Sequence, residues 1–275
     1  MTSETLIIEP GLAESNYWRD LWRYRELFYV LAWRDISVRY KQTIIGVAWA
    51  LIRPILTMVV LTLVFGNVAR LPSEGAAPYA LMVFAGLLPW QFFSTALSDS
   101  ANSLVGNANL ISKVYFPRLI VPTAAVVVSF VDFLVSFPIL LVVMAWYRFT
   151  PGWQMLALPF FVLMAFLASL GPGLWVTALN VRYRDFRYVI PFIVQFGLYI
   201  SPVGFSSSVV PARWRLLYCL NPVVGVIDGF RWAILGGKAR LYLDSLAMAC
   251  AMTAFFLWVG IKRFRRLEKR FADLL

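Results

Sequence analysis

The amino-acid sequence predicts an all-α integral membrane protein. Of its 275 residues, 61% are hydrophobic and 14% are charged, and its mean hydropathy is +0.74. Soluble domains contain roughly 45–50% apolar and about 25% charged residues. A helix needs roughly 20 mostly apolar residues to cross the hydrocarbon core of a bilayer. Six segments are candidates, of which the fifth is short: about 44–68, 79–98, 118–147, 153–179, 188–204 and 240–262.

The distribution of lysine and arginine predicts that both termini are cytosolic, because cytosolic loops carry an excess of these residues. Seventeen lie before the first span, in the connections after the second and fourth spans, and beyond the last span. Seven lie in the alternate loops. We therefore expect an even number of crossings within a single domain over 1–275. Its transmembrane region is expected at 44–262, and a cytosolic tail at 263–275.

The formal charge of +11 does not predict nucleic-acid binding. The cations cluster at the ends of apolar segments, where they would meet membrane lipids. The sequence contains no histidine and two cysteines without a CxxC spacing, which excludes most hydrolase and zinc-enzyme readings. We expect no cofactor or metal bound by this chain. Neither GNANLISK (106–113) nor GGKA (236–239) fits a nucleotide-binding loop, so ATP would be bound by another subunit.

The segment 17–40 is predicted to form an amphipathic helix in the membrane interface. Apolar residues recur at helical spacing along one of its faces, at Leu21, Tyr24, Phe28 and Leu31. We expect this face to lie in lipid, while a basic face meets anionic headgroups. The helix would at least anchor the chain, and it would also be placed to gather an anionic lipid headgroup beside the first span.

Four charged residues fall within or at the ends of the predicted spans, at Arg53, Asp99, Asp132 and Asp244. An ionised side chain costs about 2.5–3.5 kcal/mol at the centre of a transmembrane helix. Asp99 and Asp244 lie near span ends and are expected to reach interfacial water. Asp132 lies midway along its span and is expected to pair across helices or face an interior. Pro54 should loosen the first span locally.

Two connections are predicted to contain short helices. The segment 100–116 is polar enough to leave the bilayer but retains apolar residues, which favours an amphipathic helix that docks on a cytosolic partner over a simple loop. The region 205–240 is too interrupted by proline and glycine to cross as one helix, and too apolar to be a free loop. Two short helices that flank Asn221-Pro222 and return to the same side would satisfy both observations.

Aromatic residues make up 16% of the chain, and many are expected in belts at the membrane interfaces. Five candidates lie away from the span ends: Trp49, Phe84, Phe92, Phe93 and Tyr199. Aromatic faces can pack against the C–H faces of sugars, so these residues are candidates for the lining of a glycan channel. Packing against lipid is the alternative.

Several stretches, in order along almost the whole chain, carry a family resemblance: RDISVRYKQTIIGVAWALIRP (34–54), AGLLPWQFFSTAL (85–97), NLISKVYFPRLIVP (109–122), NVRYRDF (180–186), SP (201–202) and NP (221–222). Together they resemble the membrane permeases of type-2 ABC exporters that move lipid-linked polysaccharides. That group includes exporters of O-antigen, capsular polysaccharide and teichoic acid.

The resemblance implies a transporter permease of the bacterial inner membrane rather than an enzyme. It implies six transmembrane helices per subunit, a homodimer with the channel at its interface, and a separate ATPase subunit on each half that carries ATP and Mg²⁺. The implied substrate is an undecaprenyl-diphosphate-linked polysaccharide, O-antigen in the first place and capsular polysaccharide or teichoic acid as alternatives. Under this resemblance 17–40 is the interface helix, 100–116 the coupling helix and 205–236 the periplasmic re-entrant gate helices.

The resemblance also implies roles for individual residues. The diphosphate would be captured near Arg34, Arg39, Lys41 and Arg53. Coupling to the ATPase would involve Asn107, Asn109, Leu110, Ser112 and Lys113. The gate region would include Pro202, Asn221 and Pro222.

Two other classes of function remain open at this stage. An integral-membrane enzyme acting on polyprenyl-linked sugars would need a base or a metal site, and the sequence offers no histidine, no DxD motif and no clustered carboxylates. An ion-coupled secondary transporter would need a titratable coupling residue, for which Asp132 is the candidate.

Overall fold

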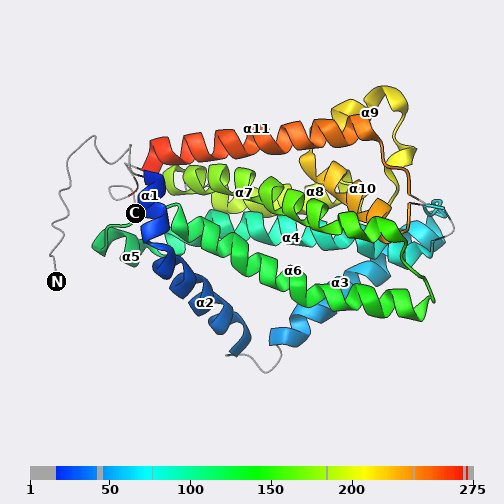
Figure 1. Cartoon of the computed structure of the whole chain (residues 1–275), viewed down its shortest axis with the longest axis horizontal. Helices are drawn as coiled ribbons and strands as arrows, with labels where there is room; N and C mark the ends of the chain where they lie inside the picture. The colour runs from blue at the N-terminus through cyan, green and yellow to red at the C-terminus, as the bar shows by residue number, and fades with distance from the viewer. Residues whose placement is uncertain are drawn as a thin grey trace.

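The computed structural model describes residues 17–41, 46–75, 77–183, 185–237, 239–268 and 271, and within these ranges the chain forms helices and no strands. Figure 1 shows long helices packed side by side in an elongated bundle, with α1, α5 and the end of α11 at one end. The helices in chain order are α1 Tyr17–Arg23, α2 Arg25–Lys41, α3 Gly46–Leu61, η2 Thr62–Val68, α4 Tyr79–Gly106, α5 Ala108–Lys113, α6 Ile120–Trp146, η3 Trp153–Ala157, α7 Leu158–Arg182, α8 Phe186–Ile200, η4 Ser207–Val209, α9 Ala212–Tyr218, α10 Pro222–Ile234 and α11 Leu243–Glu268.

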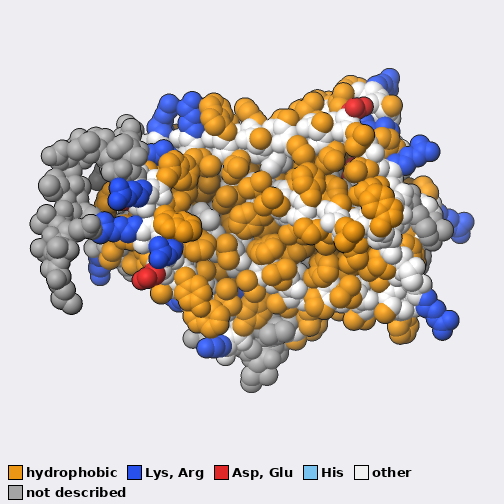
Figure 2. Space-filling model, in the orientation of Figure 1, with side chains coloured by type: hydrophobic (Ala, Val, Ile, Leu, Met, Phe, Trp, Pro, Cys, Tyr) orange, Lys and Arg blue, Asp and Glu red, His pale blue; other side chains and the backbone are white. Residues whose placement is uncertain are grey.

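Five helical stretches in the described part of the chain are long and apolar enough to cross a membrane. They are Ala48–Val68, Tyr79–Gly106, Ile120–Trp146, Trp153–Arg182 and Leu243–Glu268. The fifth predicted span, 188–204, corresponds to α8, an apolar helix of 15 residues. Figure 2 shows hydrophobic side chains over the middle of one face and lysine and arginine gathered toward its two ends. This distribution is typical of a multi-pass membrane protein.

The first span keeps its α-helical form through Pro54. The sequence predicts a local loosening there, but the wider π-helical turns of η2 begin at Thr62, two turns later. The residues 42–45, where the predicted span begins, lie outside those described.

The central helix of the bundle is α4, which packs against α6, α7 and α10. Its residues from Ala80 to Trp90 are all buried, because neighbouring helices cover it on all sides over this stretch. A helix that is hydrophobic around its whole circumference is expected in such a position. Beside it, the rings of Phe92, Phe130, Phe133 and Phe166 contact one another at centroid distances of 5.6 to 6.3 Å.

The helices α7 and α11 approach each other until their backbones touch. A Cβ atom at Gly171 would lie 2.6 Å from the backbone nitrogen of Leu257, and one at Gly260 would collide with the carbonyl oxygen of Gly171. Small residues permit such close approach between membrane helices. The two glycines therefore set the distance between α7 and α11.

Gly260→Ala is expected to lower the stability of the purified protein by about 1–3 kcal/mol, because the added methyl group must push two backbones apart. The measurement is thermal unfolding in detergent, followed by size-exclusion chromatography. Gly106→Ala is the matched control, since its Cβ atom would meet no atom within 4 Å. A Gly260→Ala protein that unfolds at the wild-type temperature would contradict the close contact.

The predicted interface helix 17–40 consists of two helices, α1 and α2, with a turn at Tyr24. Its predicted apolar face does not lie in lipid. Leu31 is buried, and Leu21, Tyr24 and Phe28 pack against a second hydrophobic cluster at this end of the bundle. That cluster joins α2 to α5, α7 and α11 through residues that include Ile111, Phe116, Leu174, Ala178 and Phe264. Helical spacing reveals an apolar face but not what covers it, so the sequence alone could not distinguish lipid from protein here.

Exposed aromatic residues of α1 and α2 lie on the outward side instead, at Trp18, Trp22, Tyr29 and Trp33. Arg25 lies over the ring of Trp22 at 5.8 Å. Exposed tryptophan next to arginine is the composition expected at lipid headgroup depth.

The predicted coupling helix 100–116 is shorter than expected. α4 continues as one helix to Gly106, so the separate helix is α5, which begins at Ala108. Within 100–106, Ser100, Ala101 and Leu104 are buried, and polar groups there bond to α7. Ser100 and Thr177 hydroxyls lie 3.1 Å apart, and Asn180 donates to the carbonyl oxygen of Ala101 at 2.8 Å. Because these polar groups have partners within the protein, the helix does not need to end where the hydropathy falls.

The region between α8 and α11 contains η4, α9 and α10 at the opposite end of the bundle from α1 (Figure 1). As expected, two short helices flank Asn221-Pro222. Asn221 caps α10 by accepting a hydrogen bond from the backbone of Val223 at 3.2 Å, and Pro222 occupies the first turn. Both residues are favoured at these positions. Asn221 also donates to Ser201 at 3.0 Å, which ties α10 to the end of α8.

Arg231 on α10 is fully buried. Its guanidinium donates to the carbonyl oxygens of Met82 at 3.2 Å, Phe205 at 2.8 Å and Val203 at 2.8 Å. It also forms an ion pair with Glu74 at 3.4 Å. A buried charge requires partners of this kind, and these partners join α10, α4 and the segments 69–78 and 201–206.

Candidate functional site

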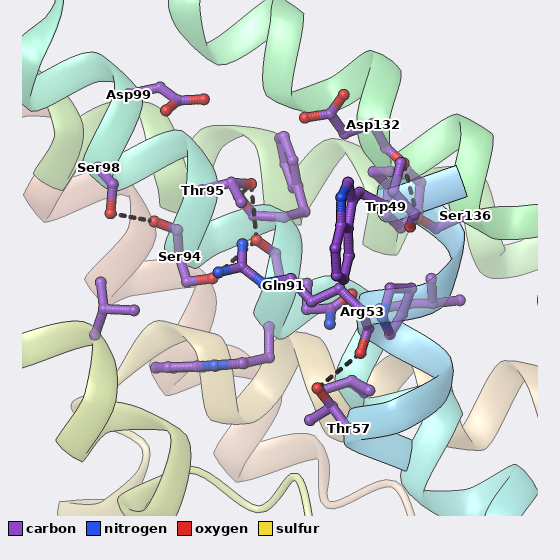
Figure 3. Close-up of a pocket in the computed structure, with 18 of the residues that line it drawn as sticks. Trp49, Arg53, Thr57, Gln91, Ser94, Thr95, Ser98, Asp99, Asp132 and Ser136 are labelled. Atoms are coloured by element: carbon purple, nitrogen blue, oxygen red, sulfur yellow. Dashed lines mark hydrogen bonds between the residues drawn. The ribbon is translucent and has the colours of Figure 1, made fainter. Parts of the chain in front are cut away.

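An open pocket of about 1030 Å³ lies along α4, between α3 on one side and α8 on the other. The end of α2 and the middle of α6 complete its wall. Figure 3 shows labelled side chains from α3, α4 and α6, with Trp49 and Arg53 on the first span facing Gln91 and Thr95 on α4. A groove of this size along a transmembrane helix is a candidate ligand-binding site.

One face of α4 presents polar side chains to the pocket, at Gln91, Ser94, Thr95 and Ser98. Their spacing of three, four and seven residues from Gln91 places them on a single side of the helix. The opposite side of α4 packs against α7. Polar side chains that line a pocket along a transmembrane helix are candidates to contact a ligand.

A charged cluster lies at the α2 end of the pocket. Arg39 donates to Asp99 at 2.8 Å and also pairs with Asp132, and the hydroxyl of Tyr40 donates to the other oxygen of Asp132. Ser129 donates to Asp99 at 3.0 Å. The cluster ties α2 to α4 and α6.

The charge state of this cluster follows from its contacts. Burial lowers the pKa of the Arg39 guanidinium, but Asp99 and Asp132 raise it by more, so the guanidinium keeps its charge. Burial and the hydrogen bond to Asp132 raise the pKa of the Tyr40 phenol. Tyr40 therefore remains a neutral donor at physiological pH. Asp132 does pair across helices, whereas Asp99 bonds to Arg39 and Ser129 rather than only meeting interfacial water.

The four cations expected to capture a headgroup are not gathered at one point. Arg39 and Arg53 both line the pocket, and Figure 3 shows Arg53 reaching into it from α3. Arg34 instead donates to Asn107 at 2.9 Å and to Asp35 at 2.8 Å. Lys41 is exposed, with its ammonium 6.0 Å from the centre of the Trp33 ring. The structure thus brings together two of the four.

The five candidate channel aromatics are also divided. Trp49 and Phe92 line the pocket, and Trp49 is 60% exposed. Phe84 is fully buried in the main core, and Phe93 packs against that core. Tyr199 is exposed on α8 outside the pocket. Phe84 therefore does not line this pocket, because α4 is covered on all sides at that position.

The residues predicted for coupling lie at the α4–α5 junction. Asn109, Ser112 and Lys113 are exposed, and Leu110 packs against the hydrophobic cluster around the buried residue Ile111. Asn107 donates to the carbonyl oxygen of Ser103 at 2.8 Å and accepts from Arg34.

The predicted gate residues Pro202, Asn221 and Pro222 lie together between α8 and α10. Pro202 and Pro222 are buried, and Asn221 caps α10.

The polar face of α4 could have been predicted from the sequence, but none of Gln91, Ser94, Thr95 and Ser98 is among the predicted site residues. The stretch WQFFSTALSD (90–99) places polar residues at 91, 94, 95, 98 and 99 within an apolar run. Their helical spacing marks one face. Among the described residues, no group of three or more His, Cys, Asp and Glu side chains is placed to hold a metal ion.

Comparison with known proteins gives a family match and several relatives. A family model described as "ABC-2 type transporter" matches residues 26–235. The O-antigen export system permease protein RfbA of Myxococcus xanthus is 28% identical over 257 residues, which cover 93% of this chain and 97% of that protein. The protein of the same name from Klebsiella pneumoniae is 26% identical, covering 91% and 95%. The polysialic acid transport protein KpsM of Escherichia coli is 23% identical, covering 86% and 91%.

Proposed function

Because this chain belongs to the ABC-2 type transporter family, a family of permeases whose ATPase is a separate subunit, we propose that it forms the transmembrane path of an exporter for a lipid-linked polysaccharide. The substrate proposed first is an undecaprenyl-diphosphate-linked O-antigen, because relatives covering over nine-tenths of the chain are named for O-antigen export. Capsular polysaccharide and teichoic acid are the alternatives, and the relative named for polysialic acid transport supports the former.

The observation that carries this proposal is the open pocket along α4. It combines one face of hydroxyl and amide groups, the ring of Trp49 and the cation Arg53. Hydroxyl and amide groups can bind sugars by hydrogen bonds, aromatic rings can pack on sugar faces, and an arginine suits a diphosphate. A second copy of the chain, placed against α3 and α8, would close the two open grooves into one channel. Both helices expose apolar side chains beside the pocket, including Leu56, Val60, Phe192 and Phe196.

A sixth crossing is proposed for α8 and the residues that follow it. A 15-residue helix extends roughly 22 Å at 1.5 Å per residue, which is shorter than the hydrocarbon core of roughly 30 Å. The buried segment 201–204 continues from α8 and is bonded to the N-cap of α10 through Ser201. With this crossing both termini would lie in the cytosol of a bacterial inner-membrane protein. The segment 205–236 and the helix α5 would then lie on opposite sides of the membrane.

In this arrangement α5 is the contact for the ATPase. Two ATPase subunits would bind ATP and Mg²⁺ and act on the two copies of α5. The exposed face of α5, formed by Asn109, Ser112 and Lys113, is available to such a partner. Its buried side is fixed to the bundle by Ile111, so a force on α5 would reach α2, α7 and α11.

The proposal is tested by reconstituting the chain with its ATPase in vesicles that contain a lipid-linked glycan. ATP hydrolysis should rise when the glycan is present, and the glycan should become accessible on the far side of the membrane. The variant Ser112→Trp/Lys113→Glu should insert normally but lose both responses, because it changes the exposed face of α5. Ile111→Ala should instead lower thermal stability. Glycan movement that continues without ATP or without this chain would refute the proposed function.

A further inference from the structure

Five serine and threonine hydroxyl groups of the pocket donate to carbonyl oxygens of their own helices. Ser94, Thr95 and Ser98 on α4 donate to backbone carbonyl oxygens three or four residues earlier, at 2.8 to 2.9 Å. Thr57 on α3 and Ser136 on α6 each donate to a carbonyl oxygen four residues earlier at 2.9 Å. A hydroxyl has one hydrogen to donate. What these five groups offer the pocket is therefore the lone pairs of their oxygens.

The formal charges of the described pocket lining cancel. Its cations are Arg39 and Arg53, and its anions are Asp99 and Asp132. Arg39 is held by both carboxylates. Arg53 has no carboxylate partner among the described residues, so it supplies the lining with a single cation that is not already paired with an acid.

A hydroxyl row that offers only acceptors, in a pocket without net charge, discriminates between classes of glycan. A neutral sugar chain presents many O–H donors, which match the acceptor oxygens of Ser94, Thr95 and Ser98. A chain with a carboxylate or phosphate in each repeat presents oxygens that carry negative charge, and these would face lone pairs. Placing an ionised group where no partner compensates it is costly in a membrane protein. Arg53 can compensate one anion at a time, such as the diphosphate at the lipid end, but not one in every repeat.

We infer that the hydroxyl row of α4 is a specificity determinant that selects a neutral, hydroxyl-rich glycan against an acidic one. This inference rests on the proposed function, since it concerns the substrate of the same pocket. The hydroxyls act as acceptors for sugar O–H groups as the chain moves along α4, and the exposed ring of Trp49 in the pocket wall packs against the apolar faces of the sugars.

The test compares two lipid-linked glycans of equal length in vesicles that contain the complex with its ATPase. One glycan is neutral and the other carries one uronic acid in each repeat. The neutral glycan should be moved at least about ten-fold faster, because each uncompensated charge in the path is unfavourable. Equal transport of the acidic glycan would overturn the inference and leave the proposed function intact. Failure of both glycans to stimulate ATP hydrolysis would refute the proposed function itself.

Substitutions of Ser94, Thr95 and Ser98 separate a role of these hydroxyls in glycan recognition from a role in folding. Thr95→Val keeps the shape but removes the acceptor, and with Ser94→Ala it should lower transport of the neutral glycan several-fold at unchanged thermal stability. Ser98→Lys adds a cation and should raise transport of the acidic glycan. Ser103→Ala is the matched control, since Ser103 also donates to a carbonyl three residues earlier, at 2.7 Å, but lies outside the pocket. An equal loss in Ser103→Ala would assign the row a structural role and overturn the inference.

Discussion

Arg231→Ala is expected to yield a protein that inserts but does not fold stably, with a loss of about 3–5 kcal/mol, the range found when one member of a buried ion pair is removed. The guanidinium donates hydrogen bonds to three carbonyl oxygens and forms an ion pair with Glu74. Each carbonyl left without a donor costs about 1–3 kcal/mol. Globular proteins are typically stable by only about 5–15 kcal/mol, so this single change would remove much of the total.

Arg231→Lys should not restore stability, because one ammonium group cannot reach acceptors that diverge around a planar guanidinium. The measurement is thermal unfolding of the purified protein, together with the monodispersity of its elution. Arg213→Ala is the control, since Arg213 is exposed and lies over Trp214 at 5.7 Å. An Arg231→Ala protein as stable as the Arg213→Ala protein would show that the buried contacts do not hold this end of the bundle together.

Arg39→Met is expected to lower stability by about 2–3 kcal/mol, the upper range for hydrogen bonds to charged groups, and to abolish export. The substitution leaves Asp99 and Asp132 without their shared cation. Two carboxylates at one site repel each other. Arg25→Met is the control on the same helix, because Arg25 is exposed.

The triple variant Arg39→Met/Asp99→Asn/Asp132→Asn separates two roles of Arg39. Stability should return, because a partly buried ion cluster replaced as a whole leaves no uncompensated charge. Export should remain lost if the guanidinium also receives the diphosphate of the substrate. The readouts are the unfolding temperature and glycan-stimulated ATP hydrolysis. Recovery of export in the triple variant would give Arg39 a purely structural role. Export by Asp132→Asn with a working ATPase would also exclude Asp132 as an ion-coupling residue.

The arrangement of helices was predictable where local sequence decides it. Long apolar runs predicted the five long helices, and the proline and glycine residues of 205–240 predicted short ones. Asn221-Pro222 was predicted as the junction because proline and glycine interrupt this region, and the structure shows that Asn221 caps α10 and Pro222 begins it. Hydropathy failed at residues 100–106, which remain helical because Ser100 and Asn180 bond across to partner helices.

The residues of the candidate site were harder to predict, because contacts between helices bring them together. Arg39 and Asp132 are 93 residues apart in the sequence, and no periodicity connects them. Arg34 and Arg39 look alike as members of one cationic run, but α2 directs one to Asn107 and the other to Asp99. Phe84 and Phe92 look alike as aromatic residues within a span, but Phe84 is enclosed in the core. Residue type indicated the chemistry of the site, and only packing could show which residues take part.

The contacts of Arg231 have a consequence for biogenesis. Glu74, Met82, Val203 and Phe205, which hold its guanidinium, all precede it in the sequence. Since chains are made from the N-terminus, every one of these partners has already left the ribosome when Arg231 emerges. The buried charge of Arg231 can thus be neutralised during synthesis, before α11 has left the ribosome. Because its partners are synthesised first, Arg231 can pair with them as it emerges and need not enter the membrane unpaired.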